Sequence, residues 1–225
     1  MKIKWGALVT DGRGKLGGHV ASKNAAGAFL RTKVTPTNPQ TTRQSTVRAL
    51  FASISQAWAA LTQAQRNAWN EAVAEWQQTN VFGDLKNPTG KALFQRLNNQ
   101  AQVAGFAAVT DVPVKEELPD AIVSSATIAI GAATITLADV DTDADTKVVL
   151  WGTAPLSAGT SGPGSKMRQL YAANGDVFSA ADAYTAYVNK FGAPVVADNI
   201  FLGVKYVLDT GQASPLQTLN ATITA

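Results

Sequence analysis

Apolar residues recur at two different intervals along the chain, and the interval changes near residue 122. In the first half they stand at positions 47, 50, 51, 54, 58 and 61, a spacing that places them on one side of a helix. Beyond residue 122 they alternate with small polar residues, as in SATIAIGAATITL, which is typical of strands with one buried face. The change predicts an α+β protein whose helical and β regions are separate.

Further short strands are expected after this alternating stretch, at 147–152, 167–172, 183–190, 200–208 and 217–224. About seven strands in roughly 105 residues is typical of an immunoglobulin-like or fibronectin-like sandwich. The chain has no Cys, which favours the fibronectin-like form without an inter-sheet disulfide. We therefore predict an extended N-terminal arm (1–40), a helical domain of about three helices (41–106), a linker (107–121) and an immunoglobulin/fibronectin-like β-sandwich (122–225).

The stretch WAALTQAQRNAW, residues 58–69, contains the end of one helix and the start of the next. Thr62 is followed three residues later by Gln65, which is the pattern of a capping box, so a second helix is expected to begin after Thr62. One tryptophan lies on each helix, Trp58 on the first and Trp69 on the second. Large aromatic side chains at these positions are expected to form the core of the helical domain.

The place of Trp76 has two interpretations. Trp76 follows Trp69 at helical spacing, and it either joins the core or is left for a partner surface.

A third helix is expected from Thr89 to a terminating Gly105.

The N-terminal region is strongly basic. Residues 1–50 hold nine Lys and Arg against Asp11, a net charge of +8, whereas residues 111–225 have a net charge of −6. Residues 1–40 are rich in Gly, Asn, Thr and Pro and show no sustained period, so they are either a disordered tail or, as we favour, an arm that orders on a partner. The expected contacts are the basic residues Arg13, Lys15, Lys23, Arg31 and Lys33 on acidic surface, and the apolar residues Leu16, Val20, Phe29 and Leu30 in grooves.

The sequence offers little for catalysis. It has no Cys and one histidine, His19, which excludes thiol nucleophiles and multi-histidine metal sites. DVDTDADT (139–146) begins like a calcium loop, but Ala144 and Leu150 occupy the glycine and glutamate positions, so it is a solvated loop or an adventitious Ca²⁺ site. GRGKLGG (12–18) lacks the ending of a phosphate loop. We expect no enzyme, no cofactor and no metal, and the chain has no apolar run of about 18 residues for a membrane helix.

Four motifs occur in order: GKLGGHVASKN (14–24), TPTNPQTTRQ (35–44), WAALTQAQRNAW (58–69), and TGKALFQRLN with AGF (89–106). Together they resemble a family of tailed-phage and prophage proteins whose members sit among virion structural genes. The resemblance covers roughly the first half of the chain. It implies a virion structural protein, made in the host cytoplasm, that binds capsid, portal or tail proteins, with self-association as a further option. A minor or decoration protein of the capsid is favoured over a neck or tail component.

Two rival functions follow from the residues. The basic arm suits a DNA-binding packaging or organising protein, although aromatic residues for stacking are sparse there. A carbohydrate- or receptor-binding module would instead need Tyr171, Tyr184 and Tyr187 to cluster on one exposed face of the sandwich.

Overall fold

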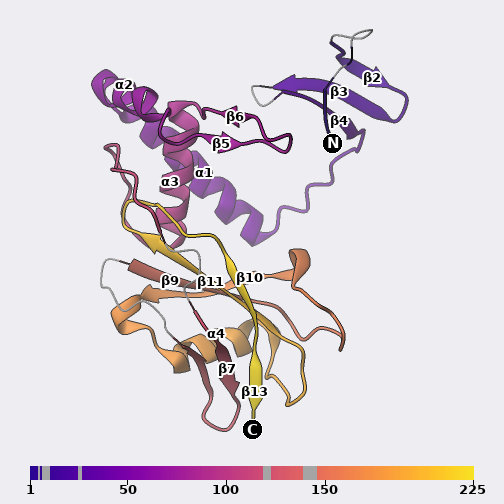
Figure 1. Cartoon of the computed structure of the whole chain (residues 1–225), viewed down its shortest axis with the longest axis vertical. Helices are drawn as coiled ribbons and strands as arrows, with labels where there is room; N and C mark the ends of the chain where they lie inside the picture. Colours follow the sequence, from indigo (N-terminus) through magenta and orange to yellow (C-terminus); the bar gives the residue numbers. More distant parts are fainter. Residues whose placement is uncertain (5, 7–10, 25–26, 119–122, 139–145) are drawn as a thin grey trace. The chain divides into compact units, whose positions relative to one another are not determined.

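The protein is seen in a computed structural model that describes residues 1–4, 6, 11–24, 27–118, 123–138 and 146–225. In these residues it has four α-helices and thirteen strands in several sheets, which confirms the α+β class. The chain forms two compact units, Met1–Leu93 and Phe94–Ala225 (Figure 1). Of the helices in the described residues, none has both the length and the hydropathy to cross a bilayer.

Residues at the N-terminus form a four-stranded antiparallel sheet with the order β1-β4-β3-β2. Its strands are β1 (Lys2–Ile3), β2 (Gly14–Leu16), β3 (His19–Asn24) and β4 (Gly27–Thr32). Gly17, with φ of +57°, and Gly18 form the two-residue connection between β2 and β3, because glycine adopts this left-handed backbone at little cost. The sequence predicted an extended arm here; the structure pairs its strands into a sheet, since the tight turn allows local hairpins.

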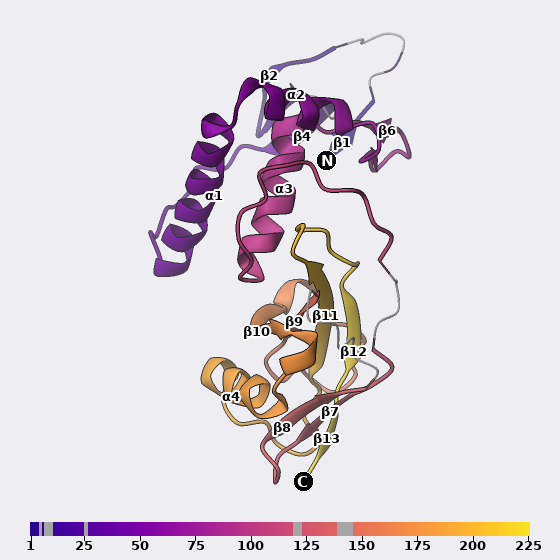
Figure 2. The ribbon, with the colours of Figure 1, turned by 90° about the vertical axis from the view of Figure 1, so that its left-hand side faces the viewer.

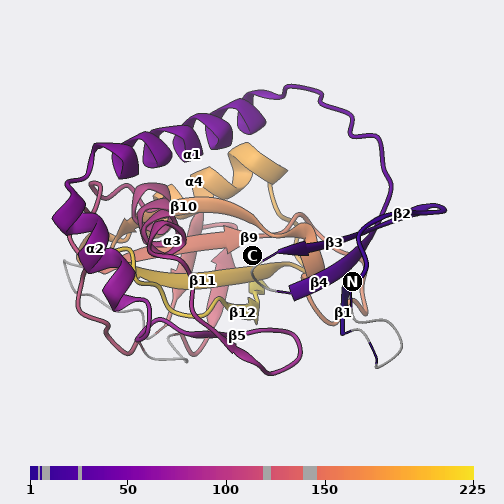
Figure 3. The same cartoon turned by 90° about the horizontal axis from the view of Figure 1, so that it is seen from above.

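Two helices follow the sheet, α1 (Thr42–Ala60) and α2 (Gln63–Ala72), and α2 leaves α1 at a steep angle (Figure 3). The expected capping box is confirmed: the Thr62 hydroxyl accepts a hydrogen bond from the Gln65 backbone N–H, and the Gln65 side chain accepts one from the Thr62 N–H. Trp69 is fully buried. Trp76 lies in a turn beyond α2 and is 7% exposed, so the alternative that leaves it for a partner is wrong.

A short hairpin separates α2 from the third helix. It consists of β5 (Gln78–Thr79) and β6 (Leu85–Lys86). The third helix, α3 (Gly90–Val103), begins after Thr89, whose hydroxyl accepts from the Ala92 N–H, and Gly105 follows its end with φ of +83°, as the sequence predicts.

The division between the two units falls inside α3, between Leu93 and Phe94, whereas the sequence predicted a linker at 107–121. Residues of that segment are fixed by hydrogen bonds within the second unit. The Gln212 side chain accepts from the Glu116 N–H at 2.7 Å and donates to the Val114 carbonyl at 2.7 Å. These hydrogen bonds hold the described part of the segment, residues 107–118, to the second unit, and we call this part the strap.

The second unit contains two sheets and a helix. Its elements are β7 (Ala126–Ala129), β8 (Thr134–Leu137), β9 (Thr146–Gly152), β10 (Arg168–Asn174), α4 (Ala180–Phe191), β11 (Phe201–Leu208), β12 (Gln217–Asn220), β13 (Thr222–Thr224), and the 3₁₀ turns Gly164–Lys166 and Gly175–Val177. The sheet orders are β10-β9-β11-β12 and β13-β7-β8. Side chains of both sheets and α4 share one core, which includes Ile128, Leu150, Tyr187 and Leu202. In Figure 2, α4 lies beside β8.

The predicted strand at 183–190 is wrong, because these residues belong to α4. Ala183 and Tyr187, four residues apart, are both buried in the core, which is helical spacing. The Ser179 hydroxyl caps the helix by accepting from the Asp182 N–H, and Gly192 ends it with φ of +92°. With a helix in this place, and with β13 parallel to β7, an immunoglobulin-like sandwich is not confirmed.

Candidate interaction surface

The pairing of the N-terminal strands sorts their side chains onto two faces. Residues directly opposite each other on neighbouring strands point to the same side of a sheet. Lys15 pairs with Val20, which pairs with Arg31, so these three form one row. Phe29 pairs with Lys2 in the adjacent row on the same side. We call this the basic face: Lys2, Lys15, Val20, Phe29 and Arg31.

The opposite side of the sheet is mostly apolar. One row there joins Leu16 to His19, and another joins Ala21 to Leu30. A third row joins Lys23, Ala28 and Ile3. We call this the apolar face: Ile3, Leu16, Ala21, Ala28 and Leu30. Leu16 is 70% exposed, so this face is open at its β2 edge.

Most of the predicted contact residues thus separate into two sets. Lys15, Val20, Phe29 and Arg31 come together on the basic face, whereas Leu16, Lys23 and Leu30 lie on the other side. Arg13 and Lys33 are exposed and lie outside the strands, and the Arg13 guanidinium is 3.7 Å from the Asp11 carboxylate.

Lys2 is a member of the basic face that the sequence analysis did not select. The sequence Lys2-Ile3-Lys4 alternates as a strand does. The strand itself has only two residues, Lys2 and Ile3, which is too short for a sequence pattern to identify.

Two cations of the basic face, Lys15 and Arg31, have no ion-pair partner among the described residues. Both side chains are exposed. The first unit holds twelve Lys and Arg against four Asp and Glu, a net charge of +8, and the second unit has a net charge of −5. A surface of this kind attracts anionic partners and orients their approach.

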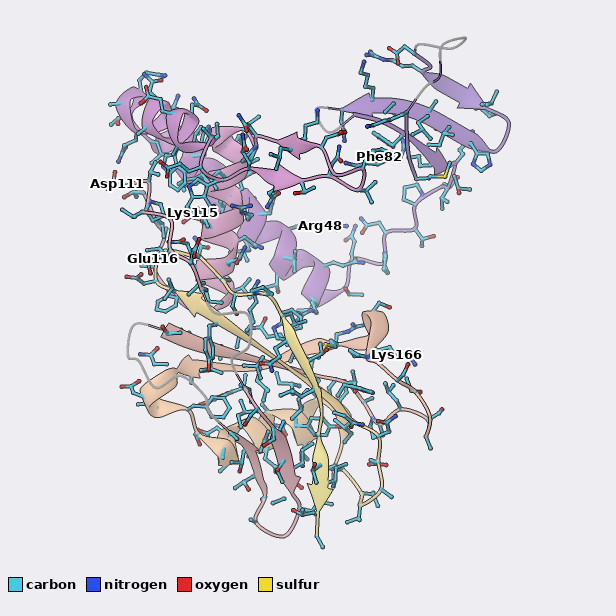
Figure 4. The ribbon with its side chains drawn as sticks, in the orientation of Figure 1. Arg48, Phe82, Asp111, Lys115, Glu116 and Lys166 are labelled. Carbon is cyan, nitrogen blue, oxygen red and sulfur yellow. The ribbon has the colours of Figure 1, made fainter. Side chains whose placement is uncertain are left out.

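The tip of the β5–β6 hairpin contacts Lys4, the residue that follows β1. The Lys4 ammonium donates to the Asp84 carboxylate at 3.3 Å and lies 5.2 Å from the centre of the Phe82 ring, at the hairpin tip in Figure 4. The Asn80 amide also donates to Asp84, at 3.0 Å. The Asn80 hydrogen bond and, to a smaller extent, Lys4 lower the pKa of Asp84 below its ordinary value. These contacts place Lys4 beside the tip of the β5–β6 hairpin.

The structure does not support a phosphate-binding loop at GRGKLGG. GRGKLGG forms the β2–β3 hairpin rather than the loop before a helix that phosphate binding needs. DVDTDADT lies, except for Thr146, outside the described residues. In the part of the chain that the structure describes, no three His, Asp or Glu side chains are grouped so as to hold a metal ion.

The three tyrosines that a carbohydrate site would need do not form an exposed cluster. Tyr187 is fully buried, and its hydroxyl donates to the Thr153 carbonyl at 3.1 Å. Burial raises the pKa of Tyr187. Tyr171 and Tyr184 are half-buried and pack against the same core. Their bulk stabilises the second unit instead of presenting a binding face.

A shallow hollow of about 250 Å³ lies on the second unit, lined by Trp151, Gly164, Ser165, Met167, Lys205 and Leu216. Lys205 is half-buried and donates to the Gln100 amide oxygen at 3.4 Å, and desolvation lowers its pKa. The hollow is walled mainly by apolar atoms around one amine, an arrangement that supplies no acid–base pair.

No family model, curated protein or solved structure matches the chain. The function is therefore argued from the geometry of the first unit.

Proposed function

We propose that the chain is a non-enzymatic structural protein of a tailed-phage particle, attached to neighbouring virion proteins through its N-terminal unit. The observation that carries the proposal is the basic face. It places the exposed cations Lys15 and Arg31 on either side of Val20, with Phe29 in the next row. Cations interleaved with apolar side chains are the composition expected of a surface that binds an acidic protein.

The motifs that resemble the phage family have clear structural roles, which supports membership in it. Gly17 and Gly18 form the β2–β3 turn, and Thr62 and Gln65 cap α2. Gly90, in the TGKALF motif, lies directly against the α2 backbone at Asn70. These five residues, from three of the four motifs, thus act in turns, caps and packing within the attaching unit.

In this proposal the second unit is the outward-facing part of the protein. Its net charge of −5 is opposite to that of the first unit, so the two units are suited to different surroundings. Within the particle we favour a capsid-associated minor or decoration protein over a neck or tail component.

Charge reversal on the basic face tests the proposal. We would replace Lys15 and Arg31 by Glu in the full chain, supply it during phage growth, and quantify it in purified particles by mass spectrometry. The matched control is Lys23→Glu, which changes an exposed cation on the opposite side of the same sheet. We expect the double variant to be lost from particles and the control to be retained. Normal incorporation of the double variant would refute attachment through this face.

A DNA-binding role is the second candidate, because the same face combines cations with the aromatic ring of Phe29. Three contacts to phosphate, from Lys2, Lys15 and Arg31, would give a slope of about −2.7 in a plot of log affinity against log salt concentration. Fluorescence anisotropy with a labelled 20-base-pair duplex measures this slope. A slope near that value, abolished by the Lys15→Glu/Arg31→Glu variant, would favour DNA over a protein partner.

A further inference from the structure

Helix α1 carries an apolar stripe that is buried at one end and open at the other. Val47, Phe51, Ile54, Trp58 and Leu61 follow one another at intervals of four, three, four and three residues. Ile54 and Leu61 are buried at 0% and 7% exposure, so the C-terminal part of the stripe belongs to the core of the first unit. Val47 and Phe51 are 56% and 55% exposed, although they lie on the same line along the helix.

This spacing is that of the seam between two packed helices. Alternating intervals of three and four residues let apolar side chains insert into the holes of a facing helix. Leu50 lies beside Phe51 and is half-buried, which widens the open end of the stripe. An exposed Phe and Val next to each other on a helix form an apolar patch of the kind that marks interaction sites.

The side chains around the apolar patch are positively charged, which favours an acidic partner over a basic one. Helix α1 contains Arg43 and Arg48 and no Asp or Glu. Arg48 projects beside the segment that leads into the helix and donates to the Asn38 side chain at 2.9 Å (Figure 4). A second copy of α1 would bring arginines against arginines, whereas acidic side chains would complement them.

We propose that the N-terminal half of α1 is a docking site for an amphipathic helix of a partner protein with acidic residues flanking its apolar stripe. Val47, Leu50 and Phe51 would form the apolar contact, and Arg43 and Arg48 the charged margin. This surface is distinct from the basic face, and it rests on the proposed function only in that the partner would be a virion protein.

The binding test uses a synthetic peptide and the purified full chain. The peptide is a fluorescein-labelled 21-residue helix with Leu at the two seam positions of each heptad and Glu at the flanking positions. A second peptide has Lys in place of each Glu. Fluorescence anisotropy is measured for the unaltered protein, for Phe51→Ala, and for the matched control Leu85→Ala, which truncates an exposed apolar side chain on β6. We expect the acidic peptide alone to bind, and Phe51→Ala to weaken binding at least tenfold while Leu85→Ala leaves it unchanged.

A charge exchange makes the test specific. The Arg43→Glu/Arg48→Glu variant should lose the acidic peptide and gain the basic one. Equal binding of both peptides, or equal binding by Phe51→Ala and Leu85→Ala, would overturn the proposal.

Two other measurements identify a different occupant. A dimer in sedimentation equilibrium that Phe51→Ala dissociates would assign the patch to a second copy and overturn the acidic partner. A larger fall in unfolding midpoint for Phe51→Ala than for Leu85→Ala would show that the protein itself covers the patch, with the same consequence. Absence of peptide binding, together with loss of the Lys15→Glu/Arg31→Glu variant from particles, would overturn the α1 site and leave the proposed function standing.

Discussion

A β-carbon placed on Gly90 would lie 2.9 Å from the backbone nitrogen of Asn70, closer than β-carbons approach neighbouring atoms. The start of α3 therefore touches the α2 backbone, and backbone atoms cannot rotate away as a side chain could. We expect Gly90→Ala to lower the free energy of unfolding by about 1–3 kcal/mol, the usual cost of forcing extra atoms into a packed contact. Urea unfolding followed by tryptophan fluorescence measures this. Gly18→Ala is the control, because nothing lies within 4 Å of that position, and an equal effect there would contradict the packing argument.

The capping box at the start of α2 gives a second prediction. Thr62→Ala removes the hydroxyl that accepts from the Gln65 N–H and should lower stability by about 1 kcal/mol. Thr62→Ser keeps the hydroxyl and should retain most of the stability. Thermal unfolding of the three proteins checks the order, and equal midpoints for Ala and Ser would show that the cap contributes nothing.

Asn98 holds the strap to α3 inside the second unit. Its buried side chain accepts from the Val109 N–H at 2.8 Å and donates to the Val109 and Phe94 carbonyls at 3.0 and 3.1 Å. Asn98→Ala leaves the Val109 N–H and carbonyl without this side-chain partner, which should cost about 1–3 kcal/mol and speed hydrogen exchange at the Val109 amide. Asn99→Ala, which alters an exposed neighbour, should do neither. Unchanged exchange at Val109 in Asn98→Ala would contradict this role.

The pKa of Asp84 is predicted to respond to two specific side chains. Since its folded pKa is lowered, its contribution to stability is present above the ordinary value of 3.8 and is lost as the pH falls through the lowered one. Lys4→Met and Asn80→Ala should each raise the pKa of Asp84 towards its ordinary value, because each removes a hydrogen bond that lowers it. Carboxyl NMR titration follows the change, with Lys23→Met as a control. An unchanged pKa of Asp84 in either variant would contradict that side chain's role.

Features set by neighbouring residues could be predicted from the sequence. The Thr62–Gln65 cap involves residues three apart, and α3 is bounded by Thr89 and Gly105, whose side chain and backbone act locally. The wrong prediction of a strand at 183–190, where the structure has α4, also has a local cause. Its tyrosines, threonine and valine are typical strand residues, and this composition concealed the four-residue spacing of Ala183 and Tyr187.

Features set by distant pairing could not be predicted. Strand β13 runs parallel to β7, and Ile223 pairs with Ile128, which lies 95 residues earlier in the chain. No local sequence pattern indicates this pairing. The division of the predicted contact residues between two faces also depends on strand pairing. Lys15 and Arg31 were selected for their charge, but only the register through Val20 places them on one face and Lys23 on the other.

The parallel pairing of β13 with β7 has a mechanical consequence. Parallel strands run in the same direction, so a pull applied between Val123, before β7, and Ala225, after β13, would slide one strand along the other. The hydrogen bonds between Thr222–Thr224 and their partners would then bear the load together instead of opening one at a time. A unit built this way resists tension along that line better than a hairpin pulled apart from its open end.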